Sequence, residues 1–381
     1  MKQNWEIKKL GDVCEIARGG SPRPIKEYIT TDSDGINWIK IGDTDPSGKY
    51  IYHTAEKIKP SGLYKSRYVE EGDFLLSNSM SFGRPYILKT NGCIHDGWLV
   101  LKNYNRSLLI DFFYYMLLSP YIQEQFEVEA KGSTVRNLNT DIVSNVKIVV
   151  PPLADQHRIV AILDAKFVQI DALKAAAQKN LDNAEQLWKA QLEKEFGNKE
   201  WKMMKLGEVA KKMLAGGDAP KDDYSETKTE QYNIPIYANA VADNGLYGYT
   251  NKAIVTEPSI TIAARGSGTG TVFLRNDSYY PIVRLIVVIP NTKITLQKYV
   301  YYAVGNIKIA HSGSAIPQLT IPMIKQYEIP IPPLAEQTAI VSRLDALSAQ
   351  ISELKAKYRR QIECCDELRQ SLLRAAFEGE M

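Results

Sequence analysis

The chain has 381 residues, 44% of them hydrophobic, which is enough for two or three domains with cores of their own. It has no run of about 18 consecutive apolar residues and does not open on the apolar core of a signal peptide, so we expect no membrane span and a cytoplasmic location. The net charge of +3 is too small to indicate nucleic-acid binding alone, and the four cysteines form no C-x-x-C pair, which argues against a metal site.

Residues 1–150 are predicted to form a mixed α+β domain. Strand-like apolar runs and one helical pattern lie, in chain order, at 36–41, 74–76, 97–101 and 111–126. A polar loop, 77–84, follows the second strand. Its backbone N–H groups, hydroxyls and arginine suit phosphate and base-edge contacts, and a plain hairpin loop would use the same residue types. The DNA-binding candidates of this loop are Asn78, Ser79, Ser81 and Arg84.

A second polar loop, 131–137, precedes the strand that closes this domain. Basic, hydroxyl and amide side chains stand together in it, a combination that suits DNA contacts. A loop that only caps and orients the following strand is the alternative. The candidates from this loop are Lys131, Ser133, Thr134, Arg136 and Asn137.

Residues 151–197 are predicted to form one long helix. Pro151 and Pro152 end the preceding strand, and an acidic side chain follows in the first helical turn, where it suits the helix dipole. Heptad position a holds Leu163, Ile170, Ala177 and Ala184, and position d holds Leu173 and Leu187. Asn180 occupies another d position. A polar residue there either fixes the register of a helix pair or is simply exposed at an imperfect seam.

Residues 198–331 are predicted to form a second mixed domain, with strands and a helix at 259–263, 271–274, 285–289 and 296–304. A glycine-rich loop, 264–271, follows the first strand. A dinucleotide-binding loop would be followed directly by a helix, whereas residues 271–274 are strand-like. The sequence therefore argues against a dinucleotide site here. The DNA-binding candidates of this loop, and of the polar loop 311–318, are Arg265, Ser267, Thr269, Ser314 and Gln318.

The last segment, 332–381, repeats the long helix. Residues 132–196 align without a gap to residues 313–377 at a constant offset of 181 (313 − 132 = 181), and Gln361 takes the place of Asn180. Trp5-x4-Leu-Gly-Asp-Val likewise matches Trp201-x4-Leu-Gly-Glu-Val. The chain is therefore two half-subunits in tandem, with a shared frame and diverged inserts. The simplest partner for each helix is the other copy, packed antiparallel, which places the two inserts at opposite ends.

This frame resembles the specificity subunits of type I restriction–modification systems over essentially the whole chain. The resemblance rests on Trp-x4-Leu-Gly-(Asp/Glu)-Val at the start of each half and on Pro-Pro-Leu-Ala-(Asp/Glu)-Gln-x2-Ile-Val before each long helix. It implies two mixed α/β target-recognition domains separated by two long antiparallel coiled-coil helices. Each domain would read half of an asymmetric, bipartite site in double-stranded DNA.

The resemblance also implies partners. Two modification subunits would carry the S-adenosylmethionine site and methylate adenine, and restriction subunits would carry the ATP-driven motor and the Mg-dependent nuclease. No cofactor is expected in this chain. Consistent with that division of labour, the sequence has no H-E-x-x-H, Walker P-loop or G-x-S-x-G motif, so we expect neither a catalytic residue nor a metal ligand.

A different class of function remains open from the sequence. A coiled-coil scaffold with two protein-binding globular ends would show the same duplication, and a near-neutral net charge slightly favours it. DNA binding that weakens steeply with salt separates the two hypotheses, because only a protein that neutralises phosphates releases counterions.

Overall fold

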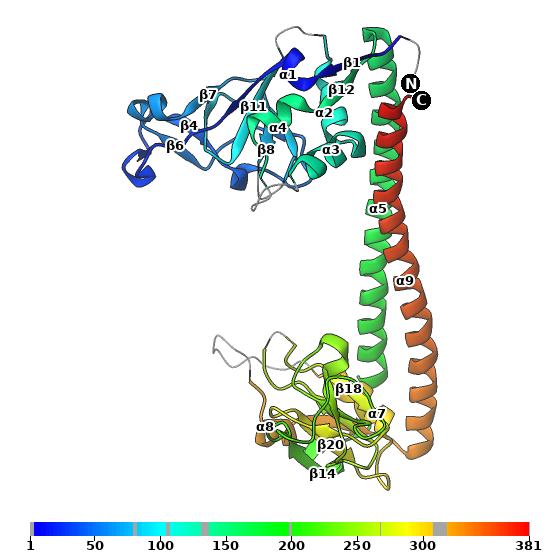
Figure 1. Cartoon of the computed structure of the whole chain (residues 1–381). Coiled ribbons are helices and arrows are strands. Elements are labelled where there is room, and N and C mark those ends of the chain that lie inside the picture. Colours follow the sequence, from blue (N-terminus) through cyan, green and yellow to red (C-terminus); the bar gives the residue numbers. More distant parts are fainter. Residues whose placement is uncertain are drawn as a thin grey trace. The chain divides into compact units, whose positions relative to one another are not determined.

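The structure is a computed structural model that describes residues 4–78, 82–103, 107–130, 137–197, 200–266, 268–307 and 318–380. It divides into two compact units: unit 1 comprises residues 1–177 and 360–381, and unit 2 comprises 178–359. The boundaries fall inside the two long helices, α5 (Leu153–Phe196) and α9 (Leu334–Glu378) (Figure 1). Each unit therefore contains one globular part and one end of each helix. In the described part of the chain, no helix is long and apolar enough to cross a membrane.

The globular part of unit 1 contains two five-stranded sheets and a short ribbon. The first sheet has the order β2 (Cys14–Arg18), β11 (Trp98–Asn103), β8 (Phe74–Ser77), β9 (Pro85–Leu88), β5 (Tyr50–Ile51). The second has the order β3 (Ile29–Thr30), β6 (Glu56–Ile58), β4 (Ile36–Ile39), β10 (Gly92–Ile94), β7 (Arg67–Val69). The ribbon pairs β1 (Glu6–Lys9) with β12 (Lys147–Val150), and the helices are α1 (Leu10–Val13), α2 (Ile110–Leu118), α3 (Pro120–Ala130) and α4 (Thr140–Asn145).

The globular part of unit 2 repeats this plan with fewer strands. Its main sheet has the order β14 (Ala210–Ala215), β20 (Ile286–Pro290), β17 (Ser259–Ile262), β18 (Val272–Arg275). A three-stranded sheet has the order β16 (Leu246–Thr250), β15 (Ile234–Tyr237), β19 (Tyr280–Pro281). The ribbon pairs β13 (Lys202–Lys205) with β21 (Glu328–Ile331), and the helices are α6 (Leu206–Val209), α7 (Gln297–Gly305) and α8 (Ile321–Lys325).

A buried glutamine explains the repeated Pro-Pro-Leu-Ala-x-Gln motif. In unit 1, Gln156 accepts a hydrogen bond from the backbone N–H of Leu109 (2.8 Å) and donates to the carbonyl oxygens of Ser107 (2.8 Å) and Pro151 (2.9 Å). In unit 2, Gln337 makes the equivalent three bonds: it accepts from the backbone N–H of Leu296 (2.9 Å) and donates to the carbonyl oxygens of Ile294 (3.0 Å) and Pro332 (2.9 Å). Both side chains are fully buried, so the amide satisfies backbone groups that would otherwise lack partners. The glutamine fastens the start of each long helix to its globular part.

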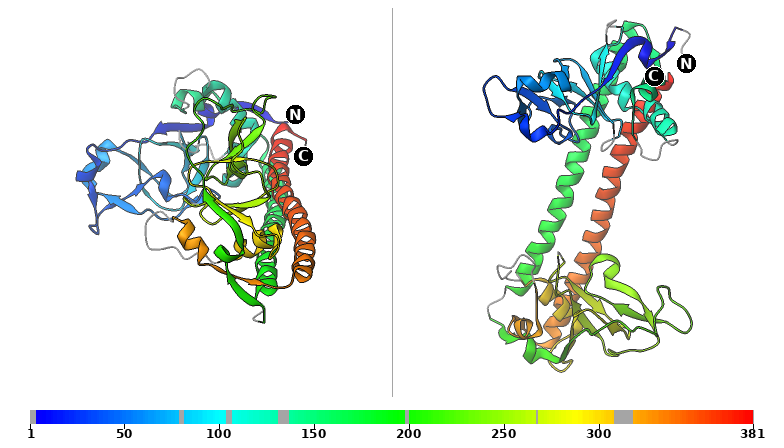
Figure 2. Two further views of the ribbon diagram at one scale, coloured as in Figure 1. Left: turned by 90° about the horizontal axis from the view of Figure 1, so that it is seen from below. Right: turned by 60° about the vertical axis from the view of Figure 1, so that its left-hand side comes forward.

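The two long helices pack antiparallel, as predicted. In unit 1, Lys174 bonds to Asp366 (2.6 Å) and Asp171 to Arg369 (2.7 Å), so the residue number rises along one helix as it falls along the other. In unit 2, Lys355 bonds to Glu185 (3.1 Å), and these two residues are the repeat equivalents of Lys174 and Asp366. Figure 2 shows the helix ends of each unit lying side by side.

The predicted heptad seam is half wrong. Position a is mostly buried, as expected, but the second column that faces the other helix is position e, whose residues are buried or half-buried. Four of the leucines at d are exposed: Leu173 by 51%, Leu187 by 52%, Leu354 by 40% and Leu368 by 49%. Position e includes Lys174, Lys355 and Arg369, whose stems cover the seam while their charges reach carboxylates of the other helix. Because these side chains are charged, hydropathy does not identify position e as part of the helix contact.

The correction extends to the two residues proposed to fix the register. Asn180 and Gln361 stand at position d and are exposed. A polar side chain fixes register only where it is buried between helices, so neither residue does so, and the alternative of simple exposure holds.

Candidate nucleic-acid interface

The two predicted loops of each half come together at one end of the sheet. In unit 1, the backbone N–H of Leu138 donates to the carbonyl oxygen of Asn78 (2.9 Å). In unit 2, the N–H of Leu319, which is the repeat equivalent of Leu138, donates to the carbonyl oxygen of Ala264 (2.8 Å). The loop that follows β8 or β17 is therefore joined to the segment that precedes α4 or α8 by the same bond in both units.

The unit 1 candidates that the structure describes are mostly engaged within the protein. Asn78 is buried and donates from its amide to the carbonyl oxygen of Asp96 (2.8 Å), which holds a neighbouring turn. Arg84 is half-buried, donates to the carbonyl oxygen of Gly48 (3.3 Å) and lies over the ring of Tyr86. Asn137 is half-buried, and its buried Oδ1 has no hydrogen-bond partner among the described residues. The candidates Ser79, Ser81, Lys131, Ser133, Thr134 and Arg136 lie outside the described residues.

The unit 2 candidates include a pair drawn from two different loops. The exposed Arg265 donates from Nη2 to Oε1 of Gln318 (3.3 Å), and the two residues also form a β-bridge. The amide of Asn239 braces this loop, since Oδ1 accepts from the N–H of Arg265 (3.3 Å) and Nδ2 donates to its carbonyl oxygen (3.0 Å). Thr269 donates to the carbonyl oxygen of Gly266 (2.7 Å) within the loop. The candidates Ser267 and Ser314 lie outside the described residues.

A turn that the sequence reasoning missed lies beside these loops in each unit. It is closed by the N–H of Trp98 donating to the oxygen of His95 (3.1 Å) in unit 1, and by Leu285 N–H donating to Ile282 (3.1 Å) in unit 2. A glycine packs against each turn: Gly19 donates to the oxygen of Trp98 (2.9 Å), and Gly216 donates to that of Leu285 (2.8 Å). A Cβ would lie 2.1 Å from backbone at the first glycine and 2.7 Å at the second. The doubled glycines 19–20 and 216–217 are the sequence signal that indicates these turns.

The equivalent turns present different side chains. In unit 1, the Asp96 carboxylate accepts from the Ser21 hydroxyl (2.6 Å), which lowers the pKa of that carboxyl, and Arg23 lies 3.7 Å away. In unit 2, Val283 and Arg284 are exposed. The first central position holds Asp96 in unit 1 and Val283 in unit 2, and the second holds Gly97 and Arg284, so the equivalent turns carry opposite charges.

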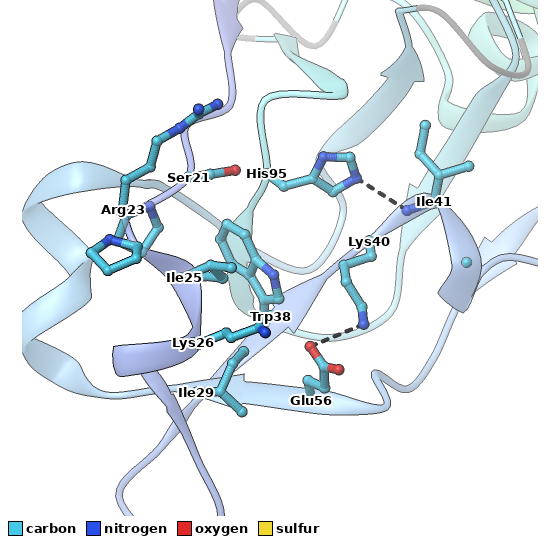
Figure 3. Close-up of a pocket in the computed structure, with 13 residues that line it drawn as sticks. Ser21, Arg23, Ile25, Lys26, Ile29, Trp38, Lys40, Ile41, Glu56 and His95 are labelled. Carbon is cyan, nitrogen blue, oxygen red and sulfur yellow. Dashed lines mark hydrogen bonds and ion pairs between the residues drawn. The ribbon is translucent and has the colours of Figure 1, made fainter.

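Unit 1 also has a cavity of about 980 Å³ beside its turn, lined by Trp38 and several aliphatic side chains (Figure 3). Its cationic lining residues are Arg23, Lys26 and Lys40, the last of which is paired with Glu56 (3.0 Å). An apolar surface flanked by cationic side chains suits a ligand in which a flat ring lies next to an anionic group.

His95, which also lines this cavity, is held by the backbone. Its Nδ1 faces the N–H of Gly97 (2.8 Å) and its Nε2 that of Ile41 (3.2 Å). A neutral imidazole has one acceptor nitrogen, so only one of these contacts is a hydrogen bond at a time. Burial lowers the pKa of His95, and two facing donors also disfavour the charged form. The ring is thus a neutral support for the turn.

Comparisons with known proteins give a consistent result. The family model described as "Type I restriction modification DNA specificity domain" matches the chain twice, at residues 2–182 and 198–364. A Mycoplasma pneumoniae protein named as a type I specificity subunit is 29% identical, over 89% of this chain and 88% of its own length. The MjaIX specificity subunit of a Methanocaldococcus jannaschii type I restriction enzyme is 24% identical, over 100% of this chain and 94% of its own.

Two solved structures share the fold over their whole length. A chain from a structure of a type I restriction–modification system has a TM-score of 0.85 at 20% identity, covering 100% of this chain and 99% of its own. The HsdS subunit of Thermoanaerobacter tengcongensis has a TM-score of 0.60 at 20% identity, covering 100% and 98%. At this identity the likeness bears on the fold alone.

Proposed function

This chain belongs to the type I restriction–modification DNA specificity family, and on that premise we propose that its two units read the two halves of an asymmetric, bipartite DNA site. The observation that supports this proposal is that the two units share their repeated elements but differ in the segments between those elements. Gln156 and Gln337 make matching bonds, whereas unit 1 adds a second five-stranded sheet with a cavity of about 980 Å³, and unit 2 has a three-stranded sheet and a smaller cavity of about 430 Å³. Unlike surfaces on one frame recognise unlike half-sites.

The chemistry of the joined loops supports contact with base edges. An arginine binds the N7 and O6 acceptors of guanine with two N–H groups, and a glutamine binds the N6 and N7 of adenine. Arg265 and Gln318 stand side by side in unit 2, and Asn239 braces the loop that carries the arginine. Such bracing lowers the conformational entropy lost on binding.

The exposed leucines support two equivalent partner sites. Unit 1 carries Leu173 and Leu368, and unit 2 carries Leu354 and Leu187, which are their repeat equivalents at the offset of 181. Residues at the same heptad position of antiparallel helices lie on the same side of the pair, so each unit presents a leucine pair to an apolar helix. We assign one modification subunit to each pair.

Methyl transfer and cleavage are proposed for partner subunits, since the chain is a specificity subunit and no catalytic residue is assigned to it. S-adenosylmethionine would bind the modification subunits, and ATP and Mg would bind the restriction subunits that join them.

A salt titration tests the proposal against a protein-binding scaffold. The chain assembled with its modification subunits should bind duplex DNA with an affinity that falls about 10³-fold or more between 50 and 200 mM salt, as expected for roughly six or more neutralised phosphates. Under the same conditions, binding to a duplex with either half-site scrambled should be much weaker. Salt-independent binding, or equal binding to all duplexes, would contradict the proposed function.

A further inference from the structure

The turn of unit 2 has an unusual backbone. Its two central residues, Val283 and Arg284, both have positive φ, of 51° and 59°. Two consecutive left-handed residues are the φ pattern of a type I′ turn, whose central positions strongly favour Asn-Gly or Gly-Gly. A β-branched residue is among the least suited to this region of backbone space.

Hydrogen bonds to the glycine pair 216–217 hold this strained turn in unit 2, and burial of the turn's side chains does not offset the strain. The N–H groups of Val283 and Arg284 donate to the carbonyl oxygens of Gly217 (2.8 Å) and Gly216 (2.9 Å), which fixes the backbone. Both side chains are nevertheless exposed, Val283 by 55%. Strain retained where the side chains contribute nothing to the core is typical of a functional position.

The equivalent turn of unit 1 lacks this strain. Its central residues are Asp96 and Gly97, and neither has a positive φ. The left-handed turn is thus a property of unit 2 and not a requirement of the shared frame.

The Arg284 side chain is exposed. Among the residues that the structure describes, none forms a hydrogen bond, an ion pair or a ring contact with it. Since β17 and β20 are antiparallel, with Ile262 opposite Ile286, the loop after β17 and the turn before β20 lie at the same end of the sheet. Arg265 and Arg284 therefore stand at that end. Two arginines at one end of a sheet attract a polyanion.

We propose that Arg284 reads a guanine in the half-site bound by unit 2, an inference that rests on the proposed function. Guanine presents the N7 and O6 acceptors in the major groove, and two coplanar N–H groups of a guanidinium can donate to both. The hydrogen bonds to Gly216 and Gly217 fix the point and the direction in which the Arg284 side chain leaves the turn. The neighbouring Arg265 and Gln318 would contact the same stretch of DNA.

The test is methylation by the assembled complex of a duplex library in which each half-site position is randomised in turn. Arg284→Gly, which suits the observed φ, should raise the thermal stability of unit 2 and lower the preference for guanine at one position about 5- to 150-fold. The other half-site should stay unchanged. Greater stability with lower discrimination distinguishes a reading residue from one that only maintains the fold.

Two further variants make the test specific. Val283→Asn relieves strain at the adjacent position and keeps the arginine, so base preference should match that of the unaltered chain. Arg284→Lys keeps the charge and loses the two-pronged fork, so binding should persist while the guanine preference falls. Equal weakening on every sequence, or a preference that Arg284→Gly leaves intact, would overturn the inference. If the unaltered complex selects no bipartite site, the proposed function fails independently of Arg284.

Discussion

Unit 1 and unit 2 fasten their long helices with the same bonds and offer different groups to a ligand. Gln156 and Gln337 bind the same set of backbone atoms, and Lys174–Asp366 and Lys355–Glu185 are equivalent ion pairs. The equivalent turns carry Asp96 in one unit and Arg284 in the other. The comparison teaches that repeated residues hold the frame, and that residues differing between the units are where to look for recognition.

The largest expected effect comes from exchanging one unit's insert. Replacing residues 1–150 with the corresponding domain of another family member should change one half-site entirely and leave the other as it was, because each globular part has its own core. Mapping of methylated adenines after the exchange would measure this. A change in both halves would mean that the units do not read independently.

The second effect concerns partner stoichiometry. Leu173→Ser combined with Leu368→Ser should reduce the bound modification subunits from two to one, since it removes the apolar contact of unit 1 alone. Both leucines are exposed, so the stability of the free chain should change by less than about 1 kcal/mol. Native mass spectrometry gives the count.

The matched control is Val168→Ser, an exposed apolar residue on α5 outside the leucine column. It should leave two subunits bound. Retention of both subunits by the double leucine variant would place the docking surface elsewhere.

The third effect is on the frame itself. Gln156→Leu should destabilise unit 1, and Gln337→Leu unit 2, each by about 2 kcal/mol, because each leaves one buried N–H and two carbonyl groups without a partner. Hydrogen exchange resolved by segment should show faster exchange in the affected unit only. The exposed Gln178→Leu should have almost no effect. Protection that stays the same in both glutamine variants would contradict this account of the repeated motif.

The smallest effect is a pH dependence confined to unit 2. Arg343 hydrogen-bonds to Glu195 (2.7 and 3.1 Å) and holds the pKa of that carboxyl below its usual value. A lowered folded-state pKa stabilises the folded state above the unfolded-state pKa of about 4.3, and the stabilisation is lost as the pH falls through the folded value. In unit 1, Ala376 takes the place of Glu195, so this pH-dependent stabilisation does not arise there.

Glu195→Gln should therefore lower the stability of unit 2 at pH 7 by about 1 kcal/mol, because Arg343 is half exposed and solvent screens the pair. The same variant should match the unaltered chain near pH 3. Urea unfolding at the two pH values provides the measurement, and an equal loss at both would rule out an ionic origin.

Much of the frame could be predicted from the sequence. The repeat at an offset of 181, the proline breaks and the position a residues indicated two long antiparallel helices, and the structure confirms the pairing. The polar loops were also found, because glycine and hydroxyl residues after an apolar strand indicate a loop whatever its tertiary contacts.

The rest depends on contacts that no local pattern encodes. Lys174 and Lys355 face the other long helix because a carboxylate of that helix pairs with each of them, whereas hydropathy alone selects the leucines at d. Arg284 was missed because valine followed by arginine gives no turn signal, and only the bonds to Gly216 and Gly217 force its backbone. Asn78, a predicted DNA contact, has its side-chain amide bonded to the oxygen of Asp96, a partner 18 residues away.

The central claim is that two globular parts, built on the same repeated scaffold but with different surfaces, recognise two different DNA half-sites. Single-molecule sequencing of the host DNA, with and without this gene, tests it directly. The account predicts methylated adenines in a two-part motif with different halves and a constant number of unread bases between them, all lost with the gene. A contiguous or palindromic motif, or methylation that persists without the gene, would contradict it.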